Sequence, residues 1–183
     1  MFIKKILLFL IIVSFITLST VTVSAQESIH SASESSKIDY QLSYPGLLPD
    51  HPLYFLKTGR DRVMAFFISN PLKKSEFDLL QADKRVWSSQ MLVDKGKINL
   101  AESTFSKAEN YFEESINNAK QAKSQGMHIE EIVKKLKDAN LKHKEVLIEI
   151  VNSLNKKDKN KFDIEAKRLN DFEKKVNDLN PKK

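Results

Sequence analysis

Residues 98–126 read INLAESTFSKAENYFEESINNAKQAKSQG, and this stretch decides the fold class. Apolar or small residues recur in it every three or four positions, which is the spacing that places side chains on one face of an α-helix. This stripe consists of Ile98, Ala101, Phe105, Ala108, Phe112, Ser115, Ala119 and Ala122. Gly126 is suited to end the helix, because glycine readily adopts the left-handed conformation found just after a helix. The stretch therefore predicts a long amphipathic helix with one buried face.

A second helix is predicted before this stretch, from about Leu72 to Asp94. Asn70 and Pro71 give it a capping residue followed by a proline in the first turn, and Lys95–Lys97 forms the turn that follows it. Its predicted apolar stripe contains Phe77, Leu80, Trp87 and Met91, with Leu79, Val86 and Val93 beside them.

Two further helices are predicted after the opening stretch. The first has an apolar face formed by Ile129, Val133, Leu136, His143, Leu147, Ile150 and Leu154. After the polar break at residues 155–161, the second carries Phe162, Ala166, Leu169, Phe172, Val176 and Leu179. Short turns between long helices make neighbours antiparallel, and the helices are too long for a tetratricopeptide repeat. The sequence thus predicts an all-α fold, an up-down antiparallel helical bundle of about five helices.

The earliest helix of the bundle follows the proline-rich segment PGLLPDHPLYFLK at residues 45–57. Its prolines predict an ordered, extended turn, with Asp50 as the cap of a helix that runs to about Ile68 and Pro52 in the first turn of that helix. This helix is unusually apolar through Leu53, Phe55, Leu56, Val63, Met64, Phe66 and Phe67. We expect residues 63–68 to pack into the core at one end of the bundle. The alternative is contact with a membrane surface or with a partner helix.

The N-terminal 25 residues have the features of a signal peptide. Lys4 and Lys5 precede an apolar run of about thirteen residues, and Val23-Ser24-Ala25 resembles a cleavage site. The run is shorter than the roughly 20 residues that span a bilayer, although an uncleaved segment up to Ala25 could anchor the chain. The predicted domain plan is a signal peptide at 1–25, a flexible serine-rich linker at 26–43, a bundle domain at 44–155, and a polar break with a C-terminal helix at 156–183.

Composition excludes several classes of protein. The chain contains no cysteine, so it has neither disulfide bonds nor the cysteine that carries the lipid of a lipoprotein. Its formal net charge is +6, but acidic and basic residues are interleaved along the chain. This pattern is typical of solvated helix faces, and it argues against nucleic-acid binding while allowing weak attraction to an anionic envelope surface.

Four motifs in a fixed order resemble a known family. They are PDHPLYFLK at 49–57, NPLKKSEFDLLQADKR at 70–85, KGKINLAESTFSKAENYF at 95–112 and KHKEVL at 142–147. Together they are similar to a bacterial family of exported or membrane-tethered helical domains of unknown function, over about residues 44–151. The resemblance implies a location outside the cytoplasm and a non-catalytic, interaction-type role. It supplies no catalytic residues, and the helix that begins near residue 158 lies outside it.

Three histidines are the candidates for a metal or small-ligand site. His51, beside Asp50, could form a metal pair or a recognition point, although a structural turn is the simpler interpretation. His143 lies on an apolar stripe, so we expect it to bond a neighbouring side chain, and burial in the neutral form would make stability depend on pH. His128 is fifteen residues from His143. This separation is about 22 Å along a helix, so these two cannot share a metal ion.

The sequence favours a binding or structural module over an enzyme. It has no G-x-S-x-G elbow and no cysteine nucleophile, and its four glycines are isolated, so no phosphate-binding loop exists. We therefore expect no catalytic residue, cofactor or metal. The expected partner is another envelope or extracellular protein, or a second copy, and the expected membrane contact is limited to an uncleaved signal segment or weak surface attraction. The alternative function is a metal- or small-ligand-binding bundle that uses His51, His128 or His143.

Overall fold

The computed structural model describes residues 39–179, and the regular elements in this range are all helical. The elements are α2 (Tyr54–Phe67), α3 (Pro71–Asp94), α4 (Ile98–Ser124), α5 (Glu130–Ser153), α6 (Lys156–Lys159), the 3₁₀ turn η1 (Asn160–Phe162) and α7 (Asp163–Asp178). The predicted all-α class and helical bundle are confirmed. The signal peptide predicted at 1–25 lies outside the described residues.

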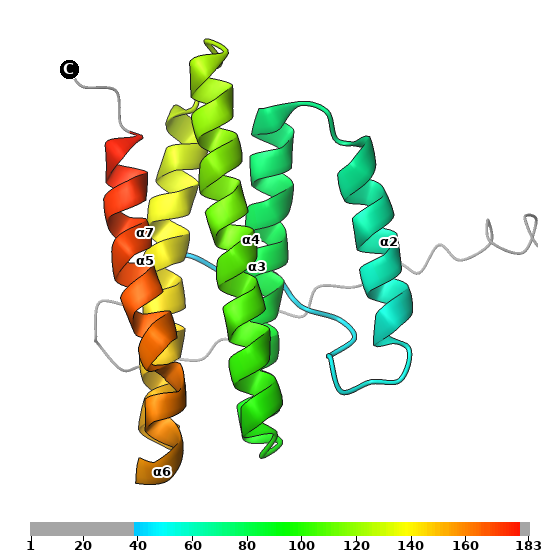
Figure 1. Ribbon diagram of the computed structural model, residues 1–183, viewed down its shortest axis with the longest axis vertical. Coiled ribbons are helices and arrows are strands. Elements are labelled where there is room, and N and C mark those ends of the chain that lie inside the picture. Colours follow the sequence, from blue (N-terminus) through cyan, green and yellow to red (C-terminus); the bar gives the residue numbers. More distant parts are fainter. Residues whose placement is uncertain (1–38, 180–183) are drawn as a thin grey trace, which may run out of the picture. The chain divides into compact units, whose positions relative to one another are not determined.

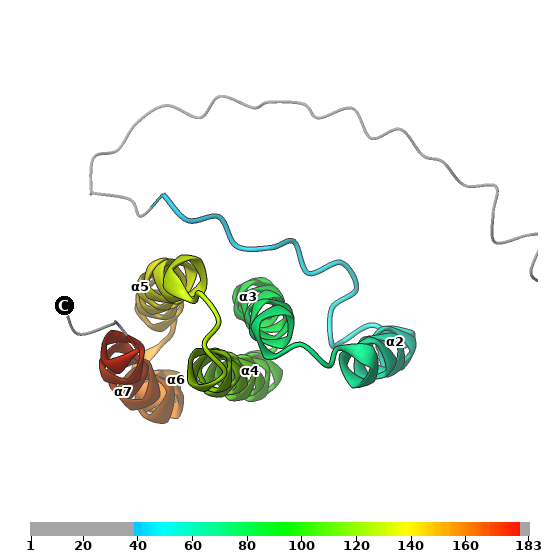
Figure 2. The ribbon, with the colours of Figure 1, turned by 90° about the horizontal axis from the view of Figure 1, so that it is seen from above.

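Four helices form the bundle. In Figures 1 and 2, α3 lies beside α4 and α5, and α7 lies beside α4 and α5. The hydroxyl of Ser75 in α3 donates to the carbonyl of Ser115 in α4 at 2.8 Å, and the hydroxyl of Ser115 donates back to the carbonyl of Ser75 at 2.7 Å. The hydroxyl of Ser89 donates to the carbonyl of Ala101 at 2.7 Å. Because such short side chains reach the opposite backbone, α3 and α4 pack closely along their length.

Two of the predicted apolar stripes match the core of the bundle. Every predicted member of the α4 stripe is buried except Ile98, which is half-buried, and the predicted α5 face is buried throughout. The predicted α3 and α7 stripes need correction. In α3 the core residues are Leu79, Ala82, Val86 and Leu92, while Leu80 is exposed. In α7, Ala166 is exposed and Glu165 is buried in its place. A period of three to four fixes a face only to within one residue, and neighbouring helices decide the rest.

Two glycines end helices as predicted. Gly96 after α3 has φ +70° and Gly126 after α4 has φ +73°, in the left-handed region that other residues rarely adopt. At the first turn, the amide of Lys97 reaches back to the carbonyl of Leu92 at 2.9 Å. This bond satisfies a carbonyl at the end of α3 that has no partner within the helix.

The segment before α2 packs on the bundle. Tyr40 and Leu42 contact the core, and the rings of Tyr44 and Trp87 meet edge to face at 5.5 Å. Tyr40 and Leu42, which the predicted flexible linker at 26–43 includes, therefore pack against the bundle. None of the described helices combines the length and the apolar composition needed to cross a membrane.

Asp50 does not cap α2, so that prediction is wrong. The helix begins at Tyr54, and no side chain caps it. The carboxylate of Asp50 instead accepts hydrogen bonds from Lys95 at 3.1 Å and Lys97 at 2.9 Å. Hydrogen bonds from Lys97 and Lys95 lower the pKa of Asp50. The proline-rich segment is thus fastened to the α3–α4 turn, which places α2 beside the bundle.

Candidate functional site

The helix α2 carries its apolar residues on the side that faces away from the bundle. Figure 2 shows α2 outside the group formed by α3, α4, α5 and α7. Phe66 is 83% exposed and Phe67 is 75% exposed. We call the exposed set the apolar outer face of α2; its members are Phe55, Leu56, Val63, Met64, Phe66 and Phe67. The prediction that residues 63–68 pack into the core is therefore wrong.

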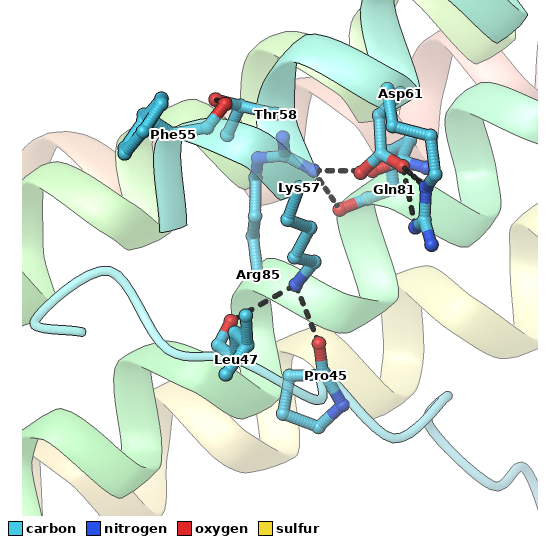
Figure 3. A network of polar contacts seen from close by, with 9 residues as sticks. Pro45, Leu47, Phe55, Lys57, Thr58, Asp61, Gln81 and Arg85 are labelled. Carbon is cyan, nitrogen blue, oxygen red and sulfur yellow. Dashed lines mark hydrogen bonds and ion pairs between the residues drawn. The ribbon is translucent and has the colours of Figure 1, made fainter. Parts of the chain in front are cut away.

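The inner side of α2 is polar. Asp61 is 4% exposed and is the buried residue of this helix. One of its carboxylate oxygens accepts two hydrogen bonds from the guanidinium of Arg60, at 2.8 and 3.1 Å. Lys57 reaches from the same helix to the carbonyls of Pro45 and Leu47, as Figure 3 shows. These polar contacts fix which side of α2 meets the bundle, and they leave the apolar side in solvent.

Two arginines border the apolar outer face. Arg60 and Arg62 are both exposed, whereas the acidic residue of the helix, Asp61, is buried and paired with Arg60. The rings of Phe66 and Phe67 meet edge to face at 5.6 Å. The surface of α2 therefore combines a contiguous apolar area with a positive border.

Two of the predicted site histidines lie apart from any cluster. His51 is exposed, and its Nδ1 accepts a hydrogen bond from the amide of Leu53 at 3.1 Å. His128 is also exposed, and its Nδ1 lies 3.9 Å from a carboxylate oxygen of Glu130. His51 therefore has the local structural role of ordering the turn that leads into α2.

His143 is the centre of a buried polar network. It is 1% exposed, and its Nε2 lies 2.8 Å from Oδ1 of Asp83 in α3. The hydroxyl of Tyr40 donates to the other oxygen of Asp83 at 2.8 Å. Burial and Asp83 raise the pKa of Tyr40, so this phenol stays protonated and donates. The expected partner of His143 exists, and it joins α5, α3 and the N-terminal segment.

The three histidines do not form a metal centre among the described residues. Within residues 39–179, no group of three or more histidine, aspartate or glutamate side chains is arranged to hold a metal ion. His143 is occupied by Asp83, and Phe112 covers it with ring centroids 5.3 Å apart. The structure therefore brings His143 together with Asp83 and Tyr40 rather than with His51 or His128.

A second buried polar group lies between α4 and α7. Glu109 is buried, and one of its oxygens lies 3.1 Å from Arg168 of α7. Burial raises the pKa of Glu109 to about 9, because the half-exposed Arg168 lowers this pKa less than burial raises it. Burial also raises the pKa of Glu165 in α7. Glu109 therefore carries a proton at neutral pH, and it serves the packing of two helices.

The protonated state of Glu109 predicts a pH effect. A carboxyl whose pKa is raised in the folded protein stabilises the fold below pH 4.5, the value of the unfolded chain, and this contribution is lost as the pH rises toward 9. Glu109→Gln imitates the protonated form at every pH. We expect this variant to match the wild type at pH 4 and to exceed its free energy of unfolding by about 5 kcal/mol at pH 8, because each pH unit above 4.5 costs the wild type about 1.4 kcal/mol. Urea denaturation at the two pH values measures this.

Glu113 is the matched control for this effect. It lies on the same helix, and a hydrogen bond from Lys175 lowers its pKa. Glu113→Gln should lose stability at pH 8 and little at pH 3, which is the opposite trend. A loss of stability at pH 8 in Glu109→Gln would show that the pair with Arg168 outweighs burial.

Sequence reasoning missed Asp83, Arg85 and Glu109 as buried polar residues. One signal was present, since Asp83 directly follows Ala82 and Arg85 directly precedes Val86, and both of these apolar residues are fully buried. A charged residue that is buried needs polar partners; Asp83 has His143 of α5, and Arg85 has Gln81 of its own helix.

Comparison with protein families gives a match over residues 46–157. The family model described as "Domain of unknown function (DUF5667)" matches residues 46–157, close to the 44–151 range of the resemblance. No curated protein and no solved structure matches the chain. The matched range includes α2, the Asp83–His143 pair and the residues around Arg85, whereas α7 lies outside it.

Proposed function

The chain belongs to the DUF5667 family, a domain family of unknown function, and from this premise we propose that it is an exported, non-catalytic module that binds a protein partner through α2. The observation that carries this proposal is the apolar outer face of α2. Contiguous apolar area of this kind is unfavourable in water, and on soluble proteins it marks sites of interaction. The module acts at the cell envelope or outside the cell.

The spacing within the outer face suits a helix that docks in a groove. Leu56, Val63 and Phe67 follow one another at intervals of seven and four, which puts them on one line along the helix. Hydrophobic grooves that bind amphipathic helices contact apolar side chains spaced at such intervals along one face of the helix. Phe55 and Phe66, eleven residues apart, form a parallel line beside them.

The charges around the outer face favour a different protein over a second copy. Two copies meeting through α2 would bring Arg60 and Arg62 near their own equivalents, and like charges across an interface are unfavourable. A partner with an apolar groove and an acidic rim complements the face best.

Export rests on the N-terminal sequence. Lys4 and Lys5, the apolar run at 6–18 and the small residues up to Ala25 are the features of a signal peptide. Fractionation of the cells that make the protein tests this part separately. We expect the protein outside the cytoplasm, with Gln26 as the first residue if the signal is cleaved. A protein found in the cytoplasm would contradict the proposal.

Site-specific photo-crosslinking in those cells tests the binding surface. The crosslinking residue replaces Phe66 in one variant and Ile164 in the other, because Ile164 is an exposed apolar residue of α7, far along the chain from α2. We expect Phe66 to capture one protein that Ile164 does not. That protein, once purified, should bind the wild type and Ile164→Ser, but should bind Phe66→Ser at least about tenfold more weakly.

Other outcomes contradict this version of the function. Capture of a second copy would make the face a dimer interface, and capture of lipid alone would make it a membrane contact. Equal capture at both positions would show that the apolar outer face has no special role.

A further inference from the structure

A basic cavity lies between the inner side of α2 and the helices α3 and α4. Its volume is about 400 Å³. The lining includes three cationic side chains, Arg62, Arg85 and Lys107, and two tyrosines, Tyr54 and Tyr111. The remaining lining residues are one proline and two threonines, so no carboxylate lines the cavity. The cavity therefore has a strongly positive wall contributed by three helices.

Arg85 is the unusual member of this wall. It is 7% exposed, and its guanidinium lies over the ring of Tyr111, 4.1 Å from the centroid. One of its terminal nitrogens, Nη1, donates to the backbone and side-chain oxygens of Gln81, both at 2.9 Å. Within residues 39–179 it forms no ion pair, although a buried arginine is rarely found without one. The N–H groups on Nε and Nη2 remain for a ligand, because a guanidinium has five donors.

Asp61 does not neutralise Arg85 directly. Figure 3 shows Asp61 near Gln81 and Arg85, but the ion pair of Asp61 is with Arg60, at 2.8 Å. Its second oxygen is buried without a hydrogen-bond partner. Arg85 therefore lines the cavity without an ion-pair partner, together with Arg62 and Lys107.

The tyrosines supply neutral donors and a flat wall. Burial is the main cause that raises the pKa of Tyr54, so its hydroxyl keeps its proton at neutral pH. The cation–π contact with the Tyr111 ring restrains the guanidinium of Arg85. A fixed guanidinium edge suits two-point recognition of an oxyanion.

We propose that Arg62, Arg85 and Lys107 bind a phosphate group in this cavity. Three cations around one space match a dianion better than a single carboxylate. Arg85 offers two parallel donors to two phosphate oxygens, while Arg62 and Lys107 approach from α2 and α4. The ligand is a free phosphate or small phosphorylated molecule, or else the head group of a phospholipid. This site shares Arg62 with the border of the apolar outer face but uses none of the apolar residues of that face.

Isothermal titration calorimetry on the protein purified from the cells that make it tests this site. The titrant is inorganic phosphate at pH 7, compared with chloride at equal ionic strength. We expect saturable phosphate binding with one site per chain. Arg62→Gln and Lys107→Gln change exposed residues and should fold normally, and each should weaken binding about tenfold. Lys134→Gln, an exposed lysine of α5 outside the cavity, should leave binding unchanged.

Arg85→Lys keeps the positive charge but removes the pair of parallel N–H donors that a guanidinium offers to two phosphate oxygens. It should therefore weaken phosphate binding by about tenfold or more. The second titrant, vesicles of phosphatidylglycerol, separates the two sources of phosphate. Vesicle binding without binding of inorganic phosphate, lost in Arg85→Lys and Lys107→Gln but kept in Lys134→Gln, assigns the site to a lipid head group. Binding of neither titrant, or binding that the three cavity variants do not change, overturns the proposal.

Discussion

Asp83→Ala is expected to lower the free energy of unfolding by about 3–5 kcal/mol. Asp83 is buried and accepts from Tyr40 while pairing with His143, each at 2.8 Å. Its removal leaves an imidazole and a phenol without their partner inside the bundle, and unpaired buried polar groups are costly. Urea denaturation at pH 7, followed by the helical circular dichroism signal, measures the change.

The control for this variant is Asp94→Ala, at the exposed end of the same helix. It should change the free energy of unfolding by less than about 0.5 kcal/mol. Asp83→Asn keeps the shape of the side chain and one acceptor oxygen. Its loss of unfolding free energy should therefore fall between the losses of Asp83→Ala and Asp94→Ala. A loss of unfolding free energy below about 1 kcal/mol in Asp83→Ala is what an ion pair exposed to solvent contributes, and it would contradict the buried network.

Phe112→Ala is the second variant with a large expected effect, again about 3–5 kcal/mol. Phe112 is fully buried, and its ring lies 5.3 Å from the rings of both His143 and Phe172. It therefore joins α4 to α5 and α7 at one point. Truncation leaves a cavity bounded by three helices, which cannot all move to close it.

Phe66→Ala is the matched control, since it removes the same ring from the apolar outer face of α2. Phe66 is exposed, so the change in unfolding free energy should stay within about 0.5 kcal/mol. Thermal denaturation of the two variants side by side measures this contrast. A loss in Phe66→Ala as large as that in Phe112→Ala would mean that α2 buries its apolar side in solution.

The bundle could be predicted from the sequence where one helix carries one clear stripe. In α4 the alanines and phenylalanines repeat without interruption, so the buried face follows directly from the period of the helix. The same holds for α5, where His143 lies in line with Leu136 and Leu147. Gly96 was predictable because the turn requires a left-handed residue.

The orientation of α2 could not be predicted in this way. Its apolar residues suggested burial, but a sequence shows only which residues share a face, not which face meets a neighbour. The bundle surface opposite α2 carries Arg85 and Tyr111, and these polar groups receive the polar side of the helix. The pairing of Asp83 with His143 could not be predicted either, because sixty residues separate the two in the sequence and no local pattern connects them.

The packing of α7 on α4 and α5 has a consequence for the size of the cooperative folding unit. Phe162, Leu169, Phe172 and Val176 belong to the same core as Phe105 and Phe112, although they lie beyond residue 157. At the other end, Tyr40 and Leu42 precede residue 46 and also contact this core. A fragment cut to residues 46–157 would uncover apolar side chains at both ends of the range. The range that matches the family model is therefore shorter than the range whose side chains form this core.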